Sequence, residues 1–173
     1  VWETALEQCL SEASKAGFKG IESGGKFPKK SEELIPKLNK YNLKLCSGWY
    51  GANLRKNTFE EEKLKIQNQL KLFQDCKAPC MVFAEVYGSI QGDPNINLSK
   101  RPRMDLDESK KYYKKISEMG KFLEDQDMPL AYHHHMGTCI ESEEDTRRLL
   151  ENTDGSVKLT LDTGHMLFAK GDS

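Results

Sequence analysis

The sequence predicts an α/β fold, a partial (β/α)8 TIM barrel that supplies about strands 2 to 6 of eight. Short apolar segments near residues 18, 43, 80, 129 and 157 alternate with longer segments of helical periodicity. This alternation is typical of parallel strands joined by right-handed crossovers. The spacing of roughly 25 to 40 residues per unit fits an eight-unit barrel, which takes ~250 residues in full. An open, flavodoxin-like sheet of five strands is the alternative.

We expect one domain, because 173 residues suffice for one hydrophobic core and two domains would be cramped. On the barrel interpretation residues 1–173 form a single incomplete domain. Its first strand would precede Val1 and its last two strands would follow Ser173. An isolated chain of this kind is expected to be inactive and prone to aggregation, because unpaired strand edges favour association.

Apolar periodicity and capping residues give the order of the elements. We expect helices over residues 2–16, 31–41, 59–76, 105–125 and 143–152. We expect strands over residues 18–22, 43–49, 79–85, 128–133 and 157–161. Ser31, Thr58 and Ser142 are expected to cap helices, since their side chains can accept bonds from free backbone N–H groups. Pro36 argues against one unbroken second helix.

The segment over residues 86–104 is long, irregular and rich in Gly, Pro and Asn. A loop of this length in a compact domain is usually a functional lid or a disordered insertion. Its basic run, Lys-Arg-Pro-Arg at residues 100–103, has the composition of a phosphate site. A solvated charge run is the expectation we adopt for it.

The composition argues against several functional classes. With 26 basic and 27 acidic residues the net charge is −1, which predicts neither a nucleic-acid nor a membrane partner. Five cysteines are an odd number without zinc-ribbon spacing, so a reducing, cytoplasmic location is expected. No apolar run approaches the ~20 residues of a membrane-spanning helix. The expected partner is a small molecule, and a homo-oligomer is possible.

Three of the four histidines lie together in residues 131–138, at a predicted strand end. Neutral histidine is a common metal ligand and an acid or base near neutral pH. In α/β sheets active groups gather at the carboxyl ends of strands. Because side chains alternate along a strand, His133 and His135 should face one side and His134 the other.

Further polar or aromatic groups follow other predicted strands. Asp162 and His165 follow the last strand, and a strand spacing of ~4.8 Å would place His133 near Asp162, as half of a divalent-metal site. The alternative is that Asp162 only caps its own turn. Glu85 ends a buried apolar strand, which favours a functional carboxylate over a solvated one. Glu22 is a weaker candidate, because the glycines after it also suit a tight turn.

Six segments together resemble the inosose dehydratase family, enzymes of myo-inositol catabolism in the xylose-isomerase-like barrel superfamily. The most specific are Gly-Ser-Ile-Gln-Gly-Asp-Pro at residues 88–94 and Tyr-His-His-His-Met-Gly-Thr at residues 132–138. The Leu-Asp-Thr-Gly-His segment at residues 161–165 is shared with many sugar isomerases. The others lie at residues 17–22, 47–49 and 101–103.

The resemblance implies removal of water from 2-keto-myo-inositol (scyllo-inosose), a cyclic polyol ketone, to give a trihydroxycyclohexane-dione with Mn²⁺ or Co²⁺. Asp162 matches a metal ligand of the superfamily, and His133 stands where relatives carry a glutamate ligand. Two further ligands would lie beyond residue 173.

The roles that follow are expectations for the other strand-end groups. His135 or His165 is expected to act as acid or base, with Glu85 as its partner. Trp49 should form an apolar wall of the substrate pocket, and Glu22 and His134 are further candidates for substrate contact. The alternatives are a sugar or ketose isomerase or epimerase of the same superfamily, and a non-catalytic fragment or sugar-binding domain.

Overall fold

The computed structural model describes residues 3–169 and contains one parallel sheet, with strand order β1-β2-β3-β4-β5. The strands are β1 (Gly20–Ser23), β2 (Lys44–Ala52), β3 (Met81–Glu85), β4 (Leu130–His133) and β5 (Val157–Thr160). Each strand pairs in parallel with the next in sequence. That order belongs to a (β/α) barrel, whereas a flavodoxin-like sheet reverses its order at a switch point. The predicted fold class is confirmed.

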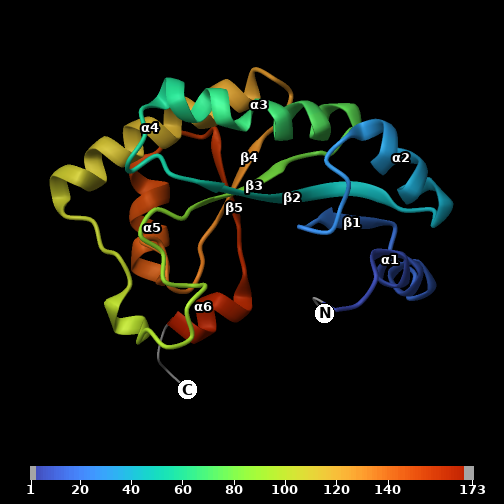
Figure 1. Ribbon diagram of the computed structural model, residues 1–173. Helices are drawn as coiled ribbons and strands as arrows, with labels where there is room; N and C mark the ends of the chain where they lie inside the picture. The colour runs from blue at the N-terminus through green and yellow to red at the C-terminus, as the bar shows by residue number, and fades with distance from the viewer. Residues whose placement is uncertain (1–2, 170–173) are drawn as a thin grey trace.

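Helices connect the strands and cover one side of the sheet, where α3 and α4 lie over its central strands (Figure 1). The helices are α1 (Leu6–Lys15), α2 (Ser31–Lys40), α3 (Phe59–Asp75), α4 (Leu106–Glu124), α5 (Glu143–Asn152) and α6 (Thr163–Ala169). The segment between β3 and α4 contains only the short 3₁₀ turn η1 (Leu98–Lys100). Within residues 3–169, no helix combines the length and apolar character needed to cross a membrane.

The strand register separates side chains onto two faces. Tyr50, Phe83 and Tyr132 stand side by side in register and belong to the hydrophobic core. Tyr50 donates a 2.7 Å hydrogen bond to Glu62 of α3, so these residues point toward the helices. We call this side the helix face. Trp49, one residue before Tyr50, points to the opposite side, which we call the inner face.

Two of the predicted helix caps are confirmed, and the structure also identifies the residue that caps α4. Thr58 begins α3 and Ser142 begins α5, each in a reciprocal capping box. Asp105 is the cap of α4, because its side chain accepts a hydrogen bond from the backbone N–H of Glu108 at 2.8 Å.

The start of α2 differs from the prediction. Lys30 is the N-cap and makes no side-chain capping bond, whereas Ser31 donates its hydroxyl to Asp75 of α3 at 2.8 Å. The helix also continues through Pro36, so the expected interruption is wrong. Pro36 lies on the exposed side of α2, where the carbonyl group that loses its donor can bond to water.

Candidate active site

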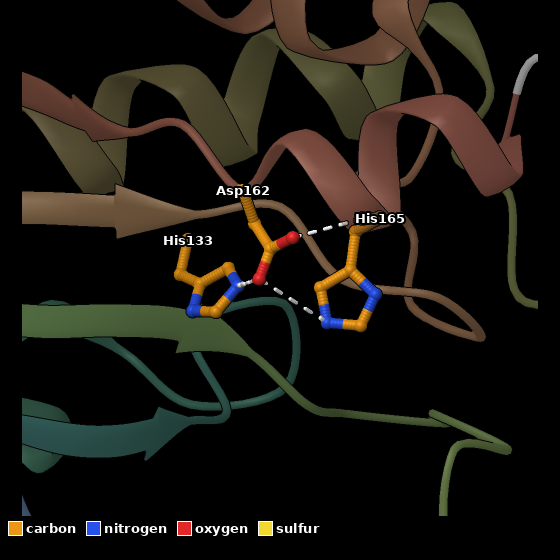
Figure 2. A group of neighbouring side chains, drawn as sticks. All are labelled: His133, Asp162 and His165. Atoms are coloured by element: carbon orange, nitrogen blue, oxygen red, sulfur yellow. Dashed lines mark hydrogen bonds and ion pairs between the residues drawn. The ribbon is translucent and has the colours of Figure 1, made fainter.

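Three potential metal ligands converge at the carboxyl ends of β4 and β5 (Figure 2). His133 ends β4, Asp162 follows β5 and His165 lies in the first turn of α6. One ligand atom from each lies within 4.8 Å of the others. Asp162 Oδ2 is 3.5 Å from His133 Nε2 and 3.8 Å from His165 Nε2. A mixed set of imidazole and carboxylate donors suits a divalent transition metal.

Asp162 uses its two carboxylate oxygens differently. Oδ1 accepts the backbone N–H of His165 at 2.8 Å, and the Asp162 carbonyl accepts the N–H of Met166 at 2.9 Å, which begins α6. Oδ2 faces both imidazoles. The His165 N–H bond is the main cause that lowers the pKa of Asp162, so the group is a carboxylate at neutral pH. Capping the turn and offering a ligand are therefore compatible roles for this residue.

His133 has the properties of a neutral ligand. Burial is the main cause that lowers its pKa to about 4, and His135 adds to the effect while Asp162 opposes it. The ring is therefore uncharged at neutral pH. Its Nε2 atom is buried and has no hydrogen-bond partner among the described residues. A buried nitrogen without a partner is costly, and a metal ion would satisfy it. The donor set thus fits a divalent ion.

His135 lies beside this cluster, on the same side as His133. Its ring centroid is 4.1 Å from that of His165, and Trp49 contacts both His133 and His135 edge-on, at 5.3 and 5.4 Å. His135 Nδ1 is 2.8 Å from the carbonyl oxygen of Met136. Because a carbonyl only accepts, Nδ1 carries the proton and Nε2 keeps its lone pair. Burial lowers the pKa of His135, which favours a neutral ring that can accept a proton.

His134 points away from this group and is completely buried. Its Nε2 accepts the backbone N–H of Asp162 at 3.2 Å, and burial lowers its pKa. The ring therefore supports the segment that carries Asp162. This position leaves it no surface for the substrate contact expected from the sequence.

Glu85 also lies elsewhere than expected. It stands beside Ala52 in register, two residues after Phe83, and therefore on the helix face. Its oxygens accept the backbone N–H groups of Tyr87 at 3.0 Å and Arg55 at 3.3 Å. Burial raises the pKa of Glu85 to about 7. The structure places this carboxyl apart from the histidines, and we do not assign it the proton-transfer role.

Glu22 is exposed on β1, the strand at the other edge of the sheet. It pairs in register with Ser47, and β2 and β3 separate it from β4, which ends at His133. It lines a hollow of about 280 Å³ that Leu6 and Phe27 share. The structure therefore does not bring Glu22 together with the histidine cluster.

Arg101 is a residue near the site that the sequence reasoning missed. Only 7% of it is exposed, so the expectation of a solvated charge run is wrong at this position, whereas Arg103 is exposed. Its guanidinium pairs with Glu141 and Asp145, both of which follow the three histidines in the sequence. Periodicity could not have marked it, because an irregular segment has none that separates buried from exposed positions. The one sequence signal was that residues 101–103 belong to a segment resembling the inosose dehydratase family.

A parallel barrel-type sheet with a cluster of histidine and aspartate at the strand ends defines a (β/α) barrel with a candidate divalent-metal site. Residues 10–173 match the family described as the xylose isomerase-like TIM barrel, and the chain belongs to that family.

Curated relatives agree with the resemblance to inosose dehydratases, which is confirmed. The chain is 37% identical over 170 residues to "Rhizopine catabolism protein MocC" of Rhizobium meliloti, with 98% of this chain and 52% of that protein covered. It is 32% identical over 172 residues to "Inosose dehydratase" of Clostridium tetani, covering 98% and 58%. The chain thus spans about half the length of these relatives.

Solved structures agree with the fold. One is a xylose isomerase-like TIM barrel protein of Mycobacterium smegmatis in complex with magnesium. It superposes with a TM-score of 0.70 at 15% identity, and the match covers 92% of this chain and 56% of that one. At this identity the likeness concerns the fold alone.

Proposed function

We propose that the full-length protein, expressed from its complete coding sequence, is a metal-dependent hydro-lyase that removes water from scyllo-inosose to give a trihydroxycyclohexane-dione. The observation that carries the proposal is the cluster of His133, Asp162 and His165 with the neutral His135 beside it. The 32% identity to the Clostridium tetani inosose dehydratase supports the choice of reaction.

His133 and Asp162 are the residues that would hold the ion, as a neutral imidazole and a carboxylate. A bound Mn²⁺ or Co²⁺ would act as a Lewis acid toward the substrate ketone and stabilise negative charge on its oxygen. Nitrogen and oxygen donors together are compatible with both ions.

The remaining steps are proton transfers by residues of this chain. His135 takes a proton from the carbon next to the ketone through Nε2, because its Nδ1 is committed to the carbonyl of Met136. His165 protonates the departing hydroxyl, with its ring oriented by Asp162 at 3.8 Å. Trp49 forms an apolar wall against the substrate ring, since its edge-on contacts place it beside both imidazoles.

The test is to incubate the full-length protein with scyllo-inosose and Mn²⁺ and to follow dione absorbance. A chelator should abolish the signal and added Mn²⁺ should restore it. Conversion of scyllo-inosose into an isomeric inosose, seen by NMR without loss of water, would instead establish the epimerase alternative.

A second candidate is a role in rhizopine catabolism. It is favoured by the 37% identity to MocC. The same assay with a rhizopine as competing substrate separates the two, because the physiological substrate should have the higher kcat/KM.

A further inference from the structure

Arg101 holds the segment between β4 and α5 by three polar contacts and the first turn of α5 by a fourth. Its Nε lies 3.1 Å from Glu141 Oε1, and its Nη2 donates to Asp145 Oδ2 at 2.7 Å. Its Nη1 donates to the carbonyl oxygens of Thr138 at 3.2 Å and Cys139 at 3.4 Å. A planar guanidinium can satisfy several acceptors at fixed angles, which an ammonium group cannot.

The segment held in this way is a tight loop that begins at His135. The backbone N–H of His135 donates to Ile140 at 3.1 Å, and the hydroxyl of Thr138 donates to the His135 carbonyl at 2.8 Å. Gly137 has a φ of +75°, and a Cβ atom there would lie 2.9 Å from the backbone nitrogen of Gln91. Glycine is therefore required at the turn.

One peptide group links this loop to the imidazole. The carbonyl of Met136 accepts the Nδ1–H of His135 at 2.8 Å. The N–H of the same peptide group belongs to Gly137 and donates to Glu141 Oε2 at 2.6 Å. The other oxygen of Glu141 faces Arg101. A continuous series of polar contacts therefore runs from Arg101 through Glu141 and the Met136–Gly137 peptide group to His135.

We propose that Glu141 and Arg101 are positioning residues that fix the tautomer and orientation of His135 through this peptide group. A carboxylate that accepts the peptide N–H makes the carbonyl at its other end a better acceptor, because hydrogen bonds in a chain polarise one another. The stronger acceptor holds the proton on Nδ1 and leaves Nε2 free. Arg101 keeps Glu141 in place through its Nε contact with Oε1. The consequence for catalysis rests on the proposed function of His135 as the base.

Glu141→Gln in the full-length protein is the sharpest variant, since it keeps the side-chain shape and leaves Arg101 paired with Asp145. We expect kcat to fall roughly 10–100-fold, the range for residues that orient a functional histidine through a hydrogen bond. The KM for scyllo-inosose, and the Mn²⁺ affinity measured by calorimetry, should each change less than about threefold. The substitution removes no metal-ligating residue and no substrate contact. Glu144→Gln is the matched control, because Glu144 is exposed and pairs only with Arg148 among the contacts described.

Arg101→Lys and Arg101→Gln test the Arg101 end of this series of polar contacts. Lysine should restore only part of the kcat lost in the Arg101→Gln variant. It keeps the positive charge but lacks the planar guanidinium that contacts several acceptors at once. Combining Arg101→Lys with Glu141→Gln should cost less than the sum of the single changes, because both act through one path. Arg103→Gln, an exposed arginine of the same run, should leave kcat unchanged.

A readout that needs no turnover separates this proposal from the proposed function. In ¹⁵N-histidine NMR the wild-type His135 should be protonated at Nδ1, and Glu141→Gln should shift it toward the Nε2–H tautomer. An unchanged tautomer, or a loss of Mn²⁺ affinity and thermal stability that accounts for the whole activity loss, would overturn the positioning role. Failure of the wild-type protein to dehydrate scyllo-inosose would overturn the proposed function alone.

Discussion

The ends of β3 and β4 look alike in the sequence and differ in the structure. Each strand is a short apolar run that ends in a titratable residue, Glu85 in one and His133 in the other. His133 pairs in register with Thr160 and faces the imidazoles and Asp162, whereas Glu85 pairs with Ala52 on the helix face. A polar group at a strand end therefore joins the site only when its position in the alternation points it inward.

Burial acts in opposite directions on the two groups. It raises the pKa of Glu85 to about 7 and lowers the pKa of His133 to about 4, because it disfavours the charged form of each. The result is a neutral ligand on the inner face, where an ion would supply the charge. On the helix face, a carboxyl group is held by the backbone N–H groups of Arg55 and Tyr87.

The largest expected effect is that of Asp162→Asn on the inner face. The amide oxygen can still accept the N–H of His165 and cap α6, but the negative charge that faces both imidazoles is lost. Mn²⁺ affinity should fall at least ~100-fold and turnover should be lost with it. Calorimetry with Mn²⁺ measures this, and circular dichroism checks that the fold is retained. An affinity within threefold of wild type would contradict the assignment of Asp162 as a ligand.

His135→Gln should have the next largest effect. Removing the base should lower kcat by about 10²–10⁴-fold, the usual contribution of general acid–base catalysis. Metal content, measured by elemental analysis, should stay close to that of wild type, because His133 and Asp162 are untouched. Near-normal turnover would remove His135 from the mechanism.

Glu85→Gln tests the helix face and should change stability but not metal binding. The folded-state pKa of about 7 lies above that of an unfolded glutamate, so the folded protein binds the extra proton between pH ~4.5 and ~7. The free energy of unfolding therefore falls as pH rises through this window, by about 3 kcal/mol from this group. The glutamine variant should lack that decrease.

Urea unfolding of both proteins at pH 5 and pH 8 measures the difference. Equal losses of stability between the two pH values in wild type and variant would show that Glu85 is not the source. A large drop in Mn²⁺ affinity in the variant would show that the two strand ends are not separate in function.

The order of the elements was predictable because each follows from local chemistry. Thr58 and Ser142 mark helix starts through capping boxes, and the alternation of strands and helices indicates the barrel order. Helix α6 was not predicted. The proximity of His133 to Asp162 was predictable too, because adjacent parallel strands bring their ends together.

The faces of β2 were less predictable. Leu45 and Tyr50 both belong to the core, although five positions apart they should point to opposite sides of a regular strand. The pairing with β1 shows the reason, a register irregularity between Ile21 and Glu22. One extra residue on β2 turns Trp49 to the inner face. A bulge of this kind depends on the neighbouring strand and leaves no local pattern.

The smallest predicted effect compares two neighbours on opposite faces of β2. Trp49→Phe keeps an aromatic ring beside the imidazoles and loses part of the contact area, so KM should rise about threefold with little change in kcat. Tyr50→Phe should instead leave KM unchanged and lower stability by about 1 kcal/mol, because it removes the hydrogen bond to Glu62. Steady-state kinetics and urea unfolding of both variants should therefore give opposite profiles. If Tyr50→Phe raised KM as much as Trp49→Phe, the assignment of Trp49 to the inner face with the substrate and of Tyr50 to the helix face would be wrong.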